Sequence, residues 1–206
     1  MLHCVAVPRT WLFAINVVSI AALSSCATST IGPSATAAAL HADVGDPTGD
    51  VVIDARVPVS PDLVRAVADV AAGNITFVIQ LAPGTLDRST TRIAVLLDTD
   101  QNGSTGISQG NGFGADYALD LTVSTAQGAI TKADPVSCAA HLSCFSPIGS
   151  VSIAVGTDSV QVQVPLAALS VADGHICFQV HSYVLFGVGD AVNFDFVPNS
   201  GGACLQ

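Results

Sequence analysis

The chain has 206 residues and a formal net charge of −10, with 16 acidic residues against six Lys and Arg. Every acidic residue is Asp, which is unfavourable inside helices, whereas Val, Ile, Thr and Gly are plentiful and suit sheets and turns. The composition predicts an all-β protein with one core. Its negative charge excludes binding to the phosphate backbone of nucleic acids and adhesion to anionic lipid by charge, and it favours divalent cations.

The N-terminus has the features of an export signal. Arg9 and the amino terminus precede an apolar run at 11–23, which is too short to span a bilayer comfortably. The sequence Leu-Ser-Ser-Cys at 23–26 resembles the lipobox of bacterial lipoproteins, in which the cysteine is acylated. We therefore expect residues 1–26 to be a signal segment and Cys26 to carry a lipid that holds an exported protein to a membrane of the cell envelope. The alternative is cleavage beyond Ala27 and free secretion.

Residues 27–45 are small and uncharged for the most part, which is typical of a flexible tether, and the domain is expected over 46–206. Short alternating or apolar segments separated by turn residues then predict an antiparallel β-sandwich or jelly roll of roughly nine strands. The expected strands cover 51–57, 64–70, 75–81, 92–97, 117–123, 150–155, 160–164, 176–185 and 192–197. One helical turn is expected at 165–169, because proline is well tolerated in the first turn of a helix.

Four cysteines remain after the signal segment, and an even number in an oxidising compartment predicts two disulfides. Proximity in the sequence favours Cys138 with Cys144 and Cys177 with Cys204, although four cysteines allow three pairings. A metal site is disfavoured there, because the lone His141 between the first two cysteines has no matching second half.

The loop after the fourth expected strand carries the clearest chemical signal. Asp98, Asp100 and Asn102 alternate before a Gly, so their oxygens could surround a hard cation, and Asp116 is the natural fourth ligand, with Asp120 a weaker one. We predict a structural calcium site on this loop. The alternative is a β-turn in which the same side chains bond their own backbone while Gly103 and Gly106 adopt positive φ.

Several short motifs together resemble the β-sandwich domains related to family-nine carbohydrate-binding modules and DOMON domains. They are Asp46-Pro-x-Gly-Asp50, Pro61-Asp62-Leu63, the strand at 75–81, the Asp98 loop, Gly114-Ala115-Asp116-Tyr117 and Asp195-x-x-Pro198-Asn199. The resemblance spans roughly residues 46–199. It implies an extracellular binding domain, and some members of the family bind haem through axial Met or His. No haem is expected here, because Met1 is the sole methionine and His175 and His181 are poorly placed to pair.

A sugar ligand needs aromatic rings for stacking. Phe113 and Phe145 lie in loops and could meet a ligand, Tyr117 is a further candidate, and Phe77, Phe178, Phe194 and Phe196 are expected in the core. Most Asp residues fall in turns, where solvated carboxylates are expected. The sequence therefore predicts a non-catalytic binding or accessory module that contacts a glycan or another envelope protein. A purely structural envelope domain is the main alternative, and a hydrolase is the least favoured one.

Overall fold

The computed structural model describes residues 39–206, apart from 55, 57–58, 110–111, 135–143 and 187–189. These residues belong to one compact unit. In chain order the strands are β1 (His41–Gly45), β2 (Leu63–Ala71), β3 (Asn74–Leu81), β4 (Thr91–Asp98), β5 (Ile107–Ser108), β6 (Gly114–Ala115), β7 (Tyr117–Thr122), β8 (Gln127–Ala133), β9 (Phe145–Val155), β10 (Ser159–Pro165), β11 (Cys177–Phe186), β12 (Asp190–Val197) and β13 (Ala203–Cys204). Two short 3₁₀ turns, η1 (Val123–Thr125) and η2 (Leu166–Leu169), complete the described elements.

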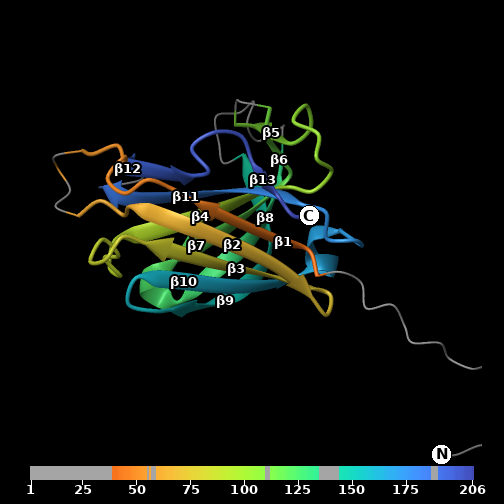
Figure 1. Ribbon diagram of the computed structural model, residues 1–206, viewed down its shortest axis with the longest axis horizontal. Helices are drawn as coiled ribbons and strands as arrows, with labels where there is room; N and C mark the ends of the chain where they lie inside the picture. Colours follow the sequence, from red (N-terminus) through yellow and green to blue (C-terminus); the bar gives the residue numbers. More distant parts are fainter. Residues whose placement is uncertain (1–38, 55, 57–58, 110–111, 135–143, 187–189) are drawn as a thin grey trace, which may run out of the picture. The chain divides into compact units, whose positions relative to one another are not determined.

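The predicted all-β antiparallel fold is confirmed. Eleven strands form one sheet in the order β1-β2-β3-β10-β9-β8-β7-β4-β11-β12, with β13 also paired to β11, and β5 and β6 form a small separate ribbon. The large sheet curls round so that β9 and β10 lie on the side opposite β11 and β12 (Figure 1). The long strand β9 makes the bend, because Phe145–Ser152 pair with β8 while Ile153–Val155 pair with β10. The two halves of the sheet therefore pack face to face as the layers of a sandwich do.

Alternation along the strands explains the core. Ile75, Phe77, Ile79 and Leu81 of β3 are buried and the residues between them are half-exposed, which matches the predicted half-buried strand. Phe77 contacts Phe178 of β11 edge to face, with ring centroids 5.3 Å apart. This pair joins the two halves of the sheet. The predicted burial of both rings is confirmed, since neither is exposed at all.

Three expectations about the chain path are wrong. Residues 41–45 are not tether but strand β1, which pairs with Arg65–Asp69. Residues 51–54 are not a strand. Val52 N–H bonds the carbonyl of Phe194, and Asp54 accepts from Arg56 N–H where the segment turns. The sequence also missed β8, whose Gly128 and Lys132 obscure its alternation, and the two-residue strands β5, β6 and β13.

A bulge in β12 reverses which of its residues face inward. Ser182 of β11 lies opposite Asp195 and Val184 opposite Val192, so β12 has one extra residue between these pairs. Because side chains alternate with a period of two, the extra residue moves Phe194 and Phe196 to the outer face, where both are half-exposed. The prediction that these two rings are core residues is therefore wrong.

The two ends of the sheet approach each other through few but specific bonds. The N–H and C=O groups of His41 in β1 exchange hydrogen bonds with Gln206, at 3.2 and 3.3 Å. Further along, the buried carboxylate of Asp195 accepts a 2.5 Å bond from the N–H of Leu63, and Ser182 Oγ donates to the carbonyl of Pro61 at 2.7 Å. Backbone groups at these two edges therefore find hydrogen-bond partners in the His41–Gln206 pairing and in the inward side chains of Ser182 and Asp195.

One predicted disulfide is present and joins opposed residues of β11 and β13, Cys177 and Cys204. Cys144 is also disulfide-bonded, and its predicted partner Cys138 lies outside the described residues, as do Cys26 and His141. Among the described residues, no helix has both the length and the apolar character needed to cross a membrane.

We expect the double variant Cys177→Ala/Cys204→Ala to lose about 3 to 4 kcal/mol of unfolding free energy. The bond closes a loop with a sequence separation of 27 residues, and in the chain-entropy picture a loop of that length stabilises by about this amount. Urea unfolding of the oxidised protein and of the variant gives the unfolding free energy of each in water, and their difference is the predicted loss. An unchanged midpoint would contradict the role given to this bond.

Candidate functional site

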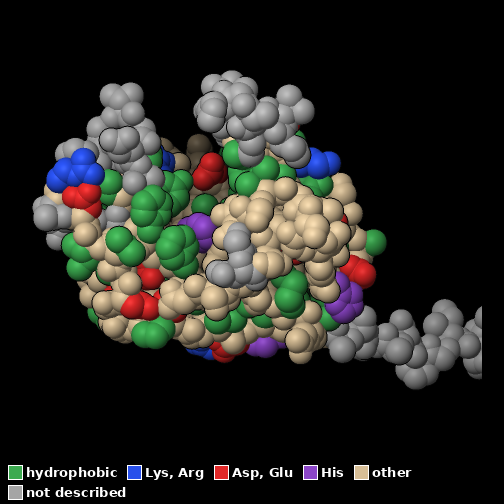
Figure 2. Space-filling view, turned by 90° about the horizontal axis from the view of Figure 1, so that it is seen from above, with side chains coloured by type: hydrophobic (Ala, Val, Ile, Leu, Met, Phe, Trp, Pro, Cys, Tyr) green, Lys and Arg blue, Asp and Glu red, His purple; other side chains and the backbone are tan. Residues whose placement is uncertain are grey.

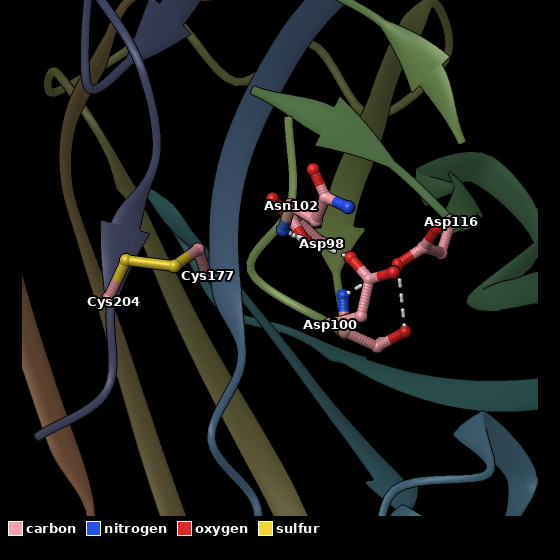
Figure 3. Close-up of a disulfide and its surroundings, with 7 residues drawn as sticks. Asp98, Asp100, Asn102, Asp116, Cys177 and Cys204 are labelled. Atoms are coloured by element: carbon pink, nitrogen blue, oxygen red, sulfur yellow. Dashed lines mark hydrogen bonds between the residues drawn. A yellow bond between two sulfur atoms is a disulfide. The ribbon is translucent and has the colours of Figure 1, made fainter. Parts of the chain in front are cut away.

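The predicted calcium loop lies where β4 ends and β7 begins. Asp98 is the last residue of β4, and Asp116 stands between β6 and β7, so pairing of β4 with β7 brings their carboxylates together. One oxygen each from Asp98, Asp100 and Asp116 lies within 4.8 Å of the others. Figure 3 shows these side chains gathered at one end of β4, near the Cys177–Cys204 disulfide of the neighbouring strand.

Backbone and hydroxyl donors already occupy these carboxylates. Asp98 and Asp100 both accept from the N–H of Asn102, at 3.1 and 3.0 Å, and Asp116 accepts from the N–H and hydroxyl of Thr99, both at 2.9 Å. The side-chain oxygen of Asn102 accepts from Ser104 N–H at 3.1 Å. This network matches the alternative of a self-bonded turn, while the convergence of three oxygens leaves calcium binding as a prediction.

The two glycines of the loop have different roles. Gly106 has a φ of 63°, and a Cβ there would lie 2.3 Å from the carbonyl oxygen of Ala115. Gly103 does not have the predicted positive φ. It is required by close packing, since a Cβ there would lie 1.9 Å from the carbonyl oxygen of Gly112. The loop is therefore held against the segment that leads into β6.

Burial raises the pKa of Asp98, which is 3% exposed, and the neighbouring charges of Asp116 and Asp100 raise it further. The bond from Asn102 N–H acts in the opposite direction and lowers that pKa. Two opposing effects therefore act on the pKa of Asp98: nearby carboxylates raise it, and the N–H donor lowers it.

The two aromatic residues predicted to meet a ligand are buried. Phe113 is 3% exposed and packs in a small outer cluster with Leu96, Ala118 and Cys177. Tyr117 is 4% exposed and faces the main core. Neither ring presents a face to solvent, so the expectation that they stack on a sugar is corrected: both stabilise the fold around the Asp98 loop.

A different set of rings lies on the outer face of β11 and β12, and the sequence reasoning did not find it as a site. Phe194 stacks between Tyr183 and Phe196, with centroids 6.3 Å from each, and His181 meets Phe196 edge to face at 4.5 Å. We call His181, Tyr183, Phe194 and Phe196 the aromatic row. Figure 2 shows hydrophobic side chains gathered on this side of the molecule beside a histidine.

Two hollows adjoin the aromatic row and supply polar groups. One, with a volume of about 290 Å³, is lined by Gln109, Gln179, His181, Phe196 and Asn199. The other, of about 400 Å³, has Arg92, Asp120, Tyr183 and Leu185 in its walls. Stacking rings beside side-chain amides, which both donate and accept hydrogen bonds, are suited to a neutral ligand with apolar faces and many hydroxyls.

Burial keeps the row uncharged at neutral pH. It lowers the pKa of His181 to about 4. It also raises the pKa of Tyr183 to about 12, with the charge of Asp120 and its bond to the tyrosine hydroxyl acting in the same direction. Nε2 of His181 lies 3.0 Å from the side-chain oxygen of Gln179, so the polar edge of the row is fixed by a hydrogen bond.

The chain matches no protein-family model and no curated protein. The resemblance to family-nine carbohydrate-binding modules and DOMON domains therefore stays a prediction.

We expect the contribution of His181 to the free energy of unfolding to fall as the pH drops from about 6.5 to about 4, against an opposite contribution from Asp46 and Asp195, whose pKa values are raised to about 7 and about 6. Neutral His181 has a folded pKa of about 4, below its ordinary 6.5, so the unfolded chain takes up the additional proton in that window. The full shift corresponds to at most about 3 kcal/mol, since each pKa unit is 1.36 kcal/mol. Urea unfolding of the wild type and His181→Gln between pH 4 and 7 isolates this contribution.

Replacement of the exposed His175 by Gln is the matched control and should leave the pH dependence of the wild type intact. Identical pH profiles for His181→Gln and the wild type would contradict the burial of a neutral imidazole.

Proposed function

We propose that this protein is a non-catalytic binding module of the bacterial cell envelope, held to a membrane by a lipid on Cys26, and that it binds glycan chains along the aromatic row. The observation that carries the proposal is the outward position of Phe194 and Phe196 on β12. Their rings continue through Tyr183 and His181 of β11, so four side chains of two strands form one unbroken contact line.

Several properties of this line favour a sugar over other small ligands. The residues from Gln179 to Leu185 span about 20 Å along β11, which suits an extended chain better than a compact molecule. Gln109, Gln179 and Asn199 provide amide groups at one end, while Arg92 and Asp120 provide charged hydrogen-bonding groups at the other. The net charge of −10 disfavours polyphosphates and nucleic acids.

A second candidate function is contact with another envelope protein. Val52 and Ile53 are 62% and 70% exposed, and Val52 donates its N–H to Phe194 O, so both lie beside the row. Exposed apolar side chains next to aromatic rings are also typical of protein interfaces. A structural domain without a ligand is the third candidate. In that case, substitutions in the aromatic row should change the binding of neither a glycan nor a protein.

We expect Phe196→Ala and Tyr183→Ala each to weaken glycan binding by about tenfold, since one stacked ring contributes on the order of 1.4 kcal/mol. An array of cell-wall and extracellular polysaccharides identifies the probe, and calorimetry with the retained glycan measures the affinities. Phe113→Leu changes a buried ring and is the matched control, which should bind as the wild type does. A silent array would instead favour the protein-contact or purely structural candidate.

We expect Cys26 to incorporate a palmitate analogue in cells and to direct the protein to the membrane fraction. Cys26→Ala should lose the label and leave that fraction, because no other anchor is proposed for the chain. Cys4→Ala alters a cysteine within the expected signal segment and should keep the label. Label on Cys26→Ala, or none on the wild type, would refute the anchor while leaving the glycan proposal to be judged separately.

A further inference from the structure

A second group of carboxylates lies where the ends of the curled sheet meet. Asp46 and Asp50 come from the turn after β1, Asp62 immediately precedes β2, and Asp195 belongs to β12. One oxygen each from Asp46, Asp50 and Asp195 lies within 4.8 Å of the others. Asp62 Oδ2 accepts a 2.9 Å bond from Gly49 N–H, so its carboxylate faces the same turn. We call these four residues the edge cluster.

Two oxygens of the edge cluster are buried and, within the described residues, accept no hydrogen bond. They are Asp46 Oδ2 and Asp62 Oδ1, and the Asp62 residue as a whole is only 5% exposed. A buried carboxylate oxygen without a partner costs several kcal/mol of desolvation unless something compensates it. The Asp98 loop differs in this respect, because none of its carboxylate oxygens is among the buried atoms that lack a partner.

The charges in the edge cluster act on one another. Burial, together with the neighbouring charges of Asp50, Asp195 and Asp62, raises the pKa of Asp46 to about 7. Burial likewise raises the pKa of Asp195 to about 6, with Asp50 and Asp62 adding to the shift. Arg56 and Arg65 form their salt bridges with Asp54 and Asp43, so those bonds do not neutralise the cluster.

We propose that the edge cluster binds a calcium ion through the converging carboxylate oxygens of Asp46, Asp50 and Asp195, with the charge of Asp62 beside them. Calcium takes six to eight oxygen ligands at about 2.3 to 2.6 Å, so oxygens on opposite sides of one ion lie about 4.6 to 5.2 Å apart. The three converging oxygens lie within 4.8 Å of one another and so fit inside such a shell. Asp46 Oδ2, a buried oxygen of this group without a hydrogen-bond partner, is one that an ion would satisfy.

The ion would join segments that are distant in the sequence. Asp46 and Asp50 are about 150 residues from Asp195, and Asn199 Nδ2 already bridges Asp46 and Asp50 with two 2.8 Å bonds. Binding would therefore fix the segment between β1 and β2 against β12. The same Asn199 lines the hollow beside Phe196, so the ion would also steady one end of the aromatic row.

The test uses the purified full chain, stripped with chelator and titrated with calcium alone or magnesium alone. Calorimetry should detect calcium binding, and the melting temperature should rise with calcium and fall with chelator. Magnesium should bind more weakly, because it requires a smaller octahedral shell. Asp50→Asn, at an exposed position, should lower calcium affinity on the order of tenfold or more.

Asp46→Asn is the second variant, and it should weaken calcium binding while the chelator-treated protein melts no lower than the wild type, because a repelling charge is removed. Asp69→Asn removes an exposed carboxylate of β2 about 20 Å along the strand and should bind calcium normally. Asp100→Asn, in the Asp98 loop, separates the two acidic groups, because it should keep the part of the calcium-dependent shift that comes from the edge cluster. Absence of calcium binding by the wild type would overturn the proposal, and so would a shift lost in Asp100→Asn but kept in Asp50→Asn and Asp46→Asn.

Discussion

Closure of the curled sheet depends on two polar side chains that point inward at neighbouring positions of β11 and β12. Ser182 and Asp195 lie opposite each other in register, and their side chains bond the backbone of Pro61 and Leu63 at the start of β2. Backbone groups at the end of a sheet need partners, and a continuous ladder normally supplies them. Here the carboxylate and the hydroxyl replace part of that ladder. A valine pair at the same two positions would add apolar surface but could not hold this end of β2.

The same region determines what the outer surface carries. Val192 and Asp195 both face inward, which requires the bulge between them, and Phe194 and Phe196 then lie on the outer face. The inward Asp195 and the outward Phe194 and Phe196 therefore all lie at or next to the bulge in β12. Asn199 lies close to both, since it bonds Asp46 and Asp50 and also lines the hollow beside Phe196. The candidate ligand surface and the acidic edge cluster are thus built on the same few residues.

Sequence patterns predicted the elements that depend mainly on neighbouring residues. Strict alternation placed β3 and β10 correctly, and Pro165 marked the 3₁₀ turn that follows β10. The outward rings of β12 were not predictable from alternation, because a bulge depends on the partner strand and leaves no clear mark in the sequence. The Asp98 loop was found because its ligand-type residues are adjacent in the sequence. The edge cluster was missed as a site, although its motifs were noted, because its members meet only after the sheet has curled.

The pairing of His41 with Gln206 also constrains when the molecule can form. The first and last strands of the described domain are neighbours in space, so this end of the sheet cannot close before Gln206 has been made. A ribosome or an export channel that releases the chain from its N-terminus first presents β1 and β2 long before their partners arrive. Until Gln206 emerges, the edge of β1 stays open to pairing with other chains. Synthesis of this protein therefore includes an interval in which β1 can pair with other chains before Gln206 reaches it.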